Sequence, residues 1–389
     1  MPAVLIGIDA SRVTRPRRTG TENYSLHVLR HLLGRPSRHQ YRLYLSQPLP
    51  NGLLPVTPST TTTRVIRLPR LWTHLGLSSE MLRAAPDVLF VPSHVLPLIC
   101  PARSVVVVYD VGHRYFPSAH GVSERLYLEW AIRRHVRRAT RLLTISQASK
   151  RDLVRLYGAD PERIAVAYPA VDARFRPAPA DEVASVRARY ELGQRYILHL
   201  GTLKPRKNLP RLVEAFARAR LPADTQLVLA GMSTHPAAEL ERVLDRTGAR
   251  ERVRRLSYVP LDDLPGLYSG ASGVAIVSLY EGFGMPALEA LACGAPVIAG
   301  TRGSLPEIVA DAALLADPLD VASIADALAR VVGDEQLAAR LGAAGPARAR
   351  AFSWAEAARV TAETLDLAGK HRLPDAGRPL PSRQPSAPN

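Results

Sequence analysis

Short apolar runs alternate with amphipathic stretches along most of the chain. A short apolar run is typical of a strand buried on both faces, and apolar side chains spaced three and four residues apart are typical of a helix. The runs predict a first series of strands at residues 4–9, 41–45, 63–68, 87–92, 104–110 and 164–168, and a second series at 196–200, 226–230, 253–259, 274–279 and from 297 onward. Two such series imply an α/β fold with two Rossmann-like, doubly wound parallel-sheet domains that face each other across a cleft.

The break between the two series is visible in the composition. Residues 169–179 are rich in proline and alanine and have no period, as is typical of a connection between domains. We therefore predict an N-terminal domain at residues 1–170, a linker at 171–190 and a C-terminal domain at 191–350. A last helix is predicted at about 355–368, and residues 371–389 are polar and rich in proline, as expected of a disordered tail.

One stretch, residues 273–299, reads as a strand, a glycine-rich turn and a helix. Two glycines within residues 281–284 mark a tight turn that ends the strand. The backbone N–H groups of Phe283, Gly284 and Met285 then lie at the start of a helix, where free N–H groups and the helix dipole favour negative charge. The sequence therefore predicts an anion site at this turn.

Two carboxylates flank the same turn, Glu281 within it and Glu289 inside the following helix. They stand eight residues apart, so they are not an acid–base pair on one helical face. We interpret them as two fixed hydrogen-bond acceptors for sugar hydroxyl groups. The alternative, two solvated surface acids, is disfavoured by the glycine-rich turn around them.

A second motif follows the predicted strand at 196–200 and has the sequence Gly-Thr-Leu-Lys-Pro-Arg-Lys-Asn. Its Arg206 and Lys207 lie where a strand gives way to a helix. A planar guanidinium binds phosphate oxygens in pairs and a compact ammonium acts as a point charge, so the two together suit a diphosphate.

Together these segments resemble the retaining family-four nucleotide-sugar glycosyltransferases (glycosyl transferases group 1), whose GT-B fold has two Rossmann-like domains. The resemblance covers roughly residues 1–360 and rests on the Glu-x7-Glu spacing and the basic loop. It implies that Glu281 contacts the donor sugar, that Glu289 contacts the nucleotide ribose, and that Arg206 and Lys207 bind the diphosphate. It also implies that the first domain lies on the acceptor side and that the last helix crosses back to it.

The same resemblance points to further donor-binding residues. Gly20 corresponds to a loop glycine that lets the backbone approach the diphosphate, although an ordinary turn glycine is the alternative. Many family members have His-Asp where this chain has Tyr109 and Asp110, so the role of that histidine does not transfer directly. Tyr109 and His113 are the two candidates for a donor contact here, and His113 is equally well a loop histidine without a role. Val259 resembles the segment that frames the nucleotide base.

The function implied is metal-independent, retaining transfer of a hexose, mannose or similar, from a nucleoside diphosphate sugar to a hydroxyl of a glycan or lipid-linked acceptor. Arg206, Lys207 and Glu281 are the expected catalytic residues, and no cofactor or metal is expected, since no Asp-x-Asp occurs in a strand context. Guanosine diphosphate mannose, a deoxysugar donor and a uridine donor all stay open. The alternatives are a sugar-nucleotide epimerase of the same fold and a noncatalytic partner subunit. A nicotinamide oxidoreductase is disfavoured because no Gly-x-Gly-x-x-Gly follows a strand.

The net charge of +16, from 51 Lys and Arg against 35 Asp and Glu, favours an anionic partner. Nucleic acid is disfavoured because no recognised binding module is present. The predicted helix at residues 121–143 carries Arg125, Arg133, Arg134, Arg137 and Arg138 beside Leu126, Trp130 and other apolar side chains. Such a helix either lies peripherally on an anionic membrane or packs its apolar face on its own sheet.

Several observations bear on location. No window approaches the ~20 consecutive apolar residues of a membrane span, and the N-terminus enters a strand without a secretory signal pattern. The two cysteines, Cys100 and Cys293, are far apart and form no disulfide framework or metal-ligand spacing. The expectation is a cytoplasmic protein, with peripheral contact at the inner face of the membrane if the basic helix binds lipid.

Overall fold

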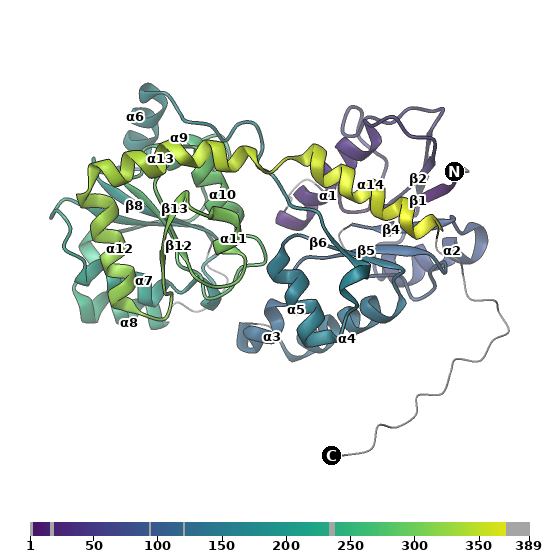
Figure 1. Cartoon of the computed structure of the whole chain (residues 1–389), viewed down its shortest axis with the longest axis horizontal. Helices are drawn as coiled ribbons and strands as arrows, with labels where there is room; N and C mark the ends of the chain where they lie inside the picture. The colour runs from purple at the N-terminus through teal and green to yellow at the C-terminus, as the bar shows by residue number, and fades with distance from the viewer. Residues whose placement is uncertain (1–2, 16–18, 93–94, 120, 233–237, 371–389) are drawn as a thin grey trace, which may run out of the picture.

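The computed structural model describes residues 3–15, 19–92, 95–119, 121–232 and 238–370. The expected tail at residues 371–389 lies outside the described residues. Within them, the chain forms two α/β units side by side, the N-terminal one on the right of Figure 1 and the C-terminal one on the left. None of the described helices has the length and apolar character that crossing a bilayer requires.

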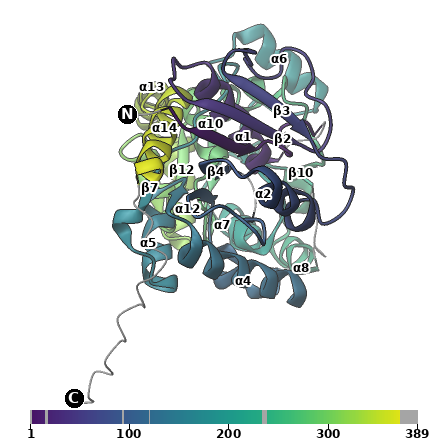
Figure 2. The same cartoon turned by 90° about the vertical axis from the view of Figure 1, so that its right-hand side faces the viewer.

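The first unit is built on a parallel sheet with the order β3-β2-β1-β4-β5-β6-β7. Its strands are β1 (Leu5–Asp9), β2 (Gln40–Leu45), β3 (Thr61–Val65), β4 (Val88–Val91), β5 (Ser104–Val108), β6 (Arg141–Thr144) and β7 (Ile164–Val166). Its helices are α1 (Gly20–Leu33), a π-helical turn (Trp72–Leu77), α2 (Ser78–Ala84), α3 (Gly112–Tyr115), α4 (Val122–Arg138) and α5 (Gln147–Tyr157), with 3-10 turns at Pro117–Ala119 and Pro161–Arg163. Figure 2 views this unit from its outer side.

The second unit has the order β10-β9-β8-β11-β12-β13, again with parallel neighbours. Its strands are β8 (Tyr196–Leu200), β9 (Gln226–Ala230), β10 (Val253–Leu256), β11 (Gly273–Ile276), β12 (Val297–Gly300) and β13 (Ala313–Ala316). Its helices are α6 (Ala180–Arg189), α7 (Leu209–Arg218), α8 (Ala238–Thr247), α9 (Leu264–Ser269), α10 (Met285–Ala292), α11 (Leu305–Val309), α12 (Val321–Gly333) and α13 (Glu335–Arg350), with 3-10 turns at Pro205–Lys207 and Arg250–Arg252.

In both sheets the order in which successive strands are added therefore reverses beside the first strand, as in a doubly wound Rossmann sheet. The reversal lies between β1 and β4 in the first sheet and between β8 and β11 in the second. Strands next to the reversal are buried along most of their length because helices cover both faces, which explains why they read as continuous apolar runs. Ligands of such sheets bind beyond the carboxyl ends of the strands at the reversal.

The last helix, α14 (Trp354–Lys370), leaves the second unit and lies along α1 of the first (Figure 1). Its Trp354 stacks on His27 with ring centroids 4.7 Å apart, and its Asp366 accepts a hydrogen bond of 2.7 Å from His39. The second unit and the first are thus joined twice, once through residues 167–179 and once through α14.

Two predicted stretches differ from the structure. The helix predicted at 121–143 ends at Arg138, because residues Arg141–Thr144 form β6 instead. The stretch expected as a linker at 171–190 contains the helix α6, whose Arg189 bonds Asp263 at 2.6 Å beside α9. α6 therefore packs with the second unit.

Candidate active site

The site is centred on three charged side chains at the β8–β11 reversal. Glu281 lies in the turn after β11, and Arg206 and Lys207 lie in the 3-10 turn after β8. One carboxylate oxygen of Glu281 accepts hydrogen bonds from Lys207 Nζ at 2.6 Å and from Ser278 Oγ at 2.7 Å. Its other oxygen accepts one from Arg206 Nη1 at 2.6 Å. The structure therefore brings the three predicted catalytic residues into direct contact.

Burial sets the electrostatics of this group. The side chains of Glu281 and Lys207 are only 5% and 6% exposed, whereas Arg206 is 29% exposed. Burial alone would raise the pKa of Glu281, but the charges of Lys207 and Arg206 outweigh it and hold that pKa at about 2. Burial lowers the pKa of Lys207, and Glu281 opposes that effect. Arg206 is thus the cation of the group that stays accessible to a ligand.

The backbone around these side chains is shaped by glycine and asparagine. Gly201 has φ +149°, and a Cβ there would lie 3.3 Å from Lys207 Nζ, so the glycine leaves room for the lysine. Asn208 has φ +62° and its amide donates to the carbonyl groups of Val277 at 3.1 Å and Pro318 at 2.6 Å. These bonds tie the basic loop to the turn after β11, which fixes Arg206 and Lys207 beside Glu281.

The start of α10 forms the next wall of the site. Gly284 is its N-cap with φ +99°, a conformation that favours glycine, and Met285 is its first residue. Ser304 stabilises the turn, because its hydroxyl donates to the carbonyl groups of Glu281 at 3.0 Å and Phe283 at 2.8 Å. The first N–H groups of α10 therefore lie in the turn that also carries Glu281, as an anion site requires.

Glu289 lies one turn further along α10 and is partly buried. Its carboxylate accepts a hydrogen bond of 2.8 Å from the buried Tyr268 hydroxyl. Burial raises the pKa of Glu289 to about 7, against the lowering effects of Tyr268 and the charge of Lys207. Glu281 and Glu289 are therefore different groups chemically, since the first is a fixed anion and the second can gain a proton near neutral pH.

The first unit faces this turn through Asp110. A Cβ added to Gly282 would lie 2.7 Å from the Cβ of Asp110, so the two units meet closely at this point. Asp110 accepts a hydrogen bond of 2.8 Å from Gly112 N–H, and its charge acts on Arg206. Gly20, the exposed first residue of α1, has open space where a side chain would project, so internal packing does not require a glycine there.

Tyr109 and His113 are held by their own unit. The Tyr109 hydroxyl lies 2.6 Å from the carbonyl oxygen of Pro92 and 3.2 Å from that of Thr21, and burial raises its pKa well above the ordinary value. His113 is buried, with its Nε2 3.1 Å from the Tyr157 hydroxyl and 3.4 Å from Glu129. Val259 is buried beyond the end of β10. None of these polar contacts of Tyr109 and His113 involves Glu281.

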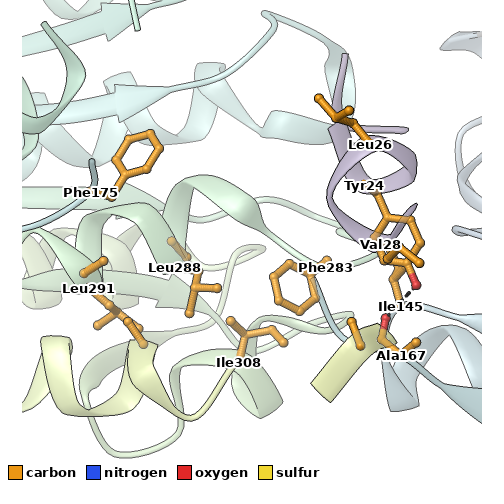
Figure 3. Packing of buried hydrophobic residues seen from close by; sticks show 14 of the residues in the cluster. Tyr24, Leu26, Val28, Ile145, Ala167, Phe175, Phe283, Leu288, Leu291 and Ile308 are labelled. Atoms are coloured by element: carbon orange, nitrogen blue, oxygen red, sulfur yellow. Dashed lines mark hydrogen bonds between the residues drawn. The ribbon is translucent and has the colours of Figure 1, made fainter. Parts of the chain in front are cut away.

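Phe283 has a packing role that sequence reasoning did not give it. Figure 3 shows it between Leu288 and Ile308 of the second unit and the group around Tyr24 and Ile145 of the first. The turn that carries Glu281 is therefore anchored in an apolar cluster that runs through both units.

Comparison with known proteins gives the family. Residues 185–348 match Glycosyl transferases group 1, and residues 18–175 match Glycosyltransferase Family 4. The chain is 34% identical over 271 residues to the O-antigen chain mannosyltransferase B of Escherichia coli, which is 68% of this chain and 70% of that protein. The chain belongs to the glycosyltransferase group 1 family. It is an enzyme of the glycosyltransferase class, as the resemblance predicted.

Two further relatives define the family context. The chain is 37% identical over 242 residues to a D-inositol 3-phosphate glycosyltransferase of Xylanimonas cellulosilytica, a match that spans 59% of this chain and 58% of that protein. The crystal structure of HepE from Anabaena, in complex with UDP and glucose, superimposes with a TM-score of 0.70 at 19% identity. That match covers 93% of this chain and 99% of HepE and confirms the GT-B fold, with two Rossmann-like parallel-sheet units.

In this glycosyltransferase, three residues near the site were not predicted. Ser278 bonds Glu281, and its position three residues earlier in the same turn is a signal that could have found it. Tyr268 and Tyr280 had no such signal, because their partners are distant in sequence. The Tyr280 hydroxyl donates to Asp152 of the first unit at 3.1 Å, and its ring stacks on Tyr115 with centroids 4.6 Å apart.

Proposed function

We propose that this glycosyltransferase moves a hexose, mannose or a similar sugar, from a nucleoside diphosphate sugar to a hydroxyl group of a glycan or lipid-linked acceptor, with retention and without a metal. The observation that carries the proposal is the buried contact of Glu281 with Arg206 and Lys207 at the β8–β11 reversal. The group presents the accessible guanidinium of Arg206 to a diphosphate, adds the buried positive charge of Lys207, and holds one fixed carboxylate for sugar hydroxyl groups. It lies at the edge where doubly wound sheets bind ligands.

In the proposed reaction the bond between the anomeric carbon and the diphosphate oxygen breaks, and the acceptor oxygen bonds to the same face of the sugar. Negative charge grows on the leaving diphosphate. Arg206, Lys207 and the first N–H groups of α10 stabilise that charge, which is work a metal ion would otherwise do. The acceptor proton passes to an oxygen of the leaving phosphate, while Glu281 orients the sugar and Glu289 the ribose.

The donor is proposed from chemistry and from relatives. The name of the E. coli relative favours mannose, and the HepE complex with UDP keeps a uridine donor open. The open space at Gly20 suits the close approach of a diphosphate to the backbone. The expected cytoplasmic location stays a prediction, since it follows from the sequence alone.

Product analysis tests the proposal. The purified chain is incubated with guanosine diphosphate mannose, uridine diphosphate glucose and a set of hydroxyl acceptors, with and without a chelator, and the product is followed by NMR. The proposal expects a product with the anomeric configuration of the donor, formed at the same rate with chelator present. An inverted product or loss of rate with chelator would contradict it. An epimerised sugar formed without acceptor would favour the epimerase alternative instead.

We also propose that α4 contacts an anionic membrane. Its Ile132 and Val136 are buried in the first unit, while Val122, Leu126 and Trp130 form an exposed apolar stripe at helical spacing. Exposed arginines, Arg133 and Arg137 among them, continue this face. An apolar face next to basic side chains is typical of helices that lie on anionic lipid.

Vesicle sedimentation tests the membrane contact. The chain should pellet with vesicles that contain phosphatidylglycerol and stay in solution with pure phosphatidylcholine vesicles. Leu126→Glu should abolish the pelleting, whereas Leu82→Glu, a change of an equally exposed leucine on α2, should leave it unchanged. Equal pelleting of both variants would contradict a role for α4.

A further inference from the structure

A cavity opens at the carboxyl edge of the first sheet, on the side of β1, β2 and β3. Its volume is about 690 Å³, within the ~300–1,000 Å³ of small-molecule sites. Its wall comes from the segments that follow these strands, including Arg12, Arg15 and Arg67, and from Trp72 and Tyr127. Neither the catalytic group around Glu281 nor Glu289 lines it. The cavity therefore lies outside the proposed donor site.

The cavity carries excess positive charge. Among the residues that the structure describes, its lining includes three arginines and no carboxylate. Glu22 of α1 is near two of them, 3.5 Å from Arg12 and 3.9 Å from Arg15, so these two arginines share it as an ion-pair partner. Within the described part of the chain, Arg67 has no ion-pair partner. Guanidinium groups that converge on a hollow without matching carboxylates are typical of phosphate recognition.

One rim of the cavity is aromatic and apolar. His74 Nε2 lies 2.8 Å from the Tyr127 hydroxyl, which joins the π-helical turn to α4. Tyr127 in turn stacks on Trp130 of the exposed apolar stripe, with ring centroids 5.8 Å apart. Leu71 and Leu75 beside this rim are 63% and 53% exposed. The charged hollow thus continues into an apolar surface.

The backbone at the same rim is unusual. Leu71 has φ +53°, a conformation that costs a non-glycine residue free energy, and the next six residues form a π-helical turn. π-helical turns are rare and occur frequently at functional sites. Both features place apolar side chains in solvent beside the arginines, which internal packing does not require.

The position of the cavity relates it to the donor site. Glu22, which contacts Arg12 and Arg15, lies in the first turn of α1, as does Gly20. The Tyr109 hydroxyl bonds the carbonyl group of Thr21 in the same turn, and Asp110 follows Tyr109. The first turn of α1 therefore contacts both the arginines of the cavity and Tyr109, whose neighbour Asp110 faces Gly282.

We propose that this cavity binds the phosphate or diphosphate group of a lipid-linked acceptor, with the hydrocarbon chain lying over Leu71, Leu75 and the apolar stripe of α4. The inference rests on the proposed function, because it assigns the acceptor side of the same reaction. Arg12 and Arg67 bind the phosphate oxygens, and Trp72 packs against the part of the acceptor next to the phosphate. The acceptor sugar then points across the start of α1 toward the donor.

Binding of simple amphiphiles tests this assignment. Octyl diphosphate, inorganic pyrophosphate and octyl glucoside are titrated by calorimetry into the full chain with the donor site saturated by a nucleoside diphosphate. Octyl diphosphate should bind at least tenfold more tightly than either of the others. Arg67→Gln should weaken that binding about tenfold, whereas Arg70→Gln, the same change at an exposed arginine outside the cavity, should alter it less than twofold.

The remaining outcomes separate the possible failures. Equal binding of octyl diphosphate to wild type and Arg67→Gln, or no binding, would overturn the assignment. Equal binding of pyrophosphate and octyl diphosphate would overturn the lipid part and indicate a water-soluble phosphate. Nucleoside diphosphate affinity should be the same in wild type and both variants. If the wild type did not bind nucleoside diphosphate at all, the proposed donor site would be overturned instead.

Discussion

At the level of single residues, the proposed transfer depends on Arg206, the accessible cation beside the buried ion pair of Lys207 and Glu281. Lys207 and Glu281 are almost fully buried, so Arg206 is the cation of this group that can contact the leaving diphosphate directly. Arg206→Ala should lower turnover on the order of a hundredfold, since it removes charge stabilisation in the transition state. Steady-state kinetics measure the effect. Arg220→Ala, at an exposed arginine beyond α7, should leave turnover unchanged, and equal turnover of both variants would count against this role.

Glu289 provides a pH-dependent prediction. Its pKa is about 7 in the folded chain against an ordinary 4.5, because burial disfavours the carboxylate. The stability it contributes is therefore fully present below about pH 4.5 and is lost as the pH rises through 7. Glu289→Gln should exceed the wild type in free energy of unfolding by roughly 1–3 kcal/mol at pH 8 and match it near pH 4.5. Urea denaturation at both pH values measures this, and a pH-independent difference would refute the explanation.

The residues that the sequence could identify are those that belong to contiguous motifs. Arg206 and Lys207 share one loop, and Glu281, Gly284 and Glu289 share one turn and helix. Tyr109 shows the limit of what the sequence can reveal. Nothing in the residues next to it in the chain indicates that its hydroxyl bonds the carbonyl groups of Pro92 and Thr21. Those partners are set by how β5 lies beside β4 and α1, which is a property of the folded sheet.

At the scale of elements, the start of α10 depends on Gly284. Its φ of +99° is unfavourable for other residues, and a Cβ there would lie 2.7 Å from Leu305. Gly284→Ala should therefore destabilise the chain by about 1–3 kcal/mol. Gly333→Ala, at the end of α12 where a Cβ meets open space, should be neutral or slightly stabilising. Chemical denaturation compares them, and equal stabilities would show that the turn tolerates a side chain.

Element boundaries were predictable where periodicity ended at a glycine or proline and not elsewhere. The helix α1 ends at Leu33, directly before Gly34, whereas the helix predicted at 121–143 ran on into β6. The segment Arg141–Thr144 is too short to show a period of its own, and only pairing with β5 and β7 makes it a strand. Similarly, α6 is fixed by its contact with α9, which its own composition does not indicate.

At the scale of the whole molecule, Tyr280 links the two units beside the site. It precedes Glu281, its carbonyl group accepts a hydrogen bond of 3.1 Å from Arg206, and its ring is buried among residues of the first unit. Tyr280→Ala should let the units separate, which would increase the radius of gyration and reduce turnover. Nucleoside diphosphate affinity should change little, because Arg206 and Lys207 both belong to the second unit.

Small-angle X-ray scattering measures that separation. Tyr280→Phe is the matched control, since it keeps the ring on Tyr115 and loses only the two hydrogen bonds of the hydroxyl. One is donated to Asp152 and the other is accepted from Val111 N–H at 3.4 Å, and each is worth about 1 kcal/mol. Its radius of gyration should match the wild type. If Tyr280→Ala also matched the wild type, the link would not hold the units together. This contact was beyond sequence reasoning, because residues 115, 152 and 280 meet only in the assembled fold.

The most direct test of the central claim is calorimetric titration of nucleoside diphosphates into the full chain. Guanosine or uridine diphosphate should bind at least tenfold more tightly than the nucleoside without phosphates, and Arg206→Ala should remove most of this difference. Equal affinity for nucleoside and nucleoside diphosphate in the wild type would contradict the claim that Arg206, Lys207 and the start of α10 form a diphosphate site.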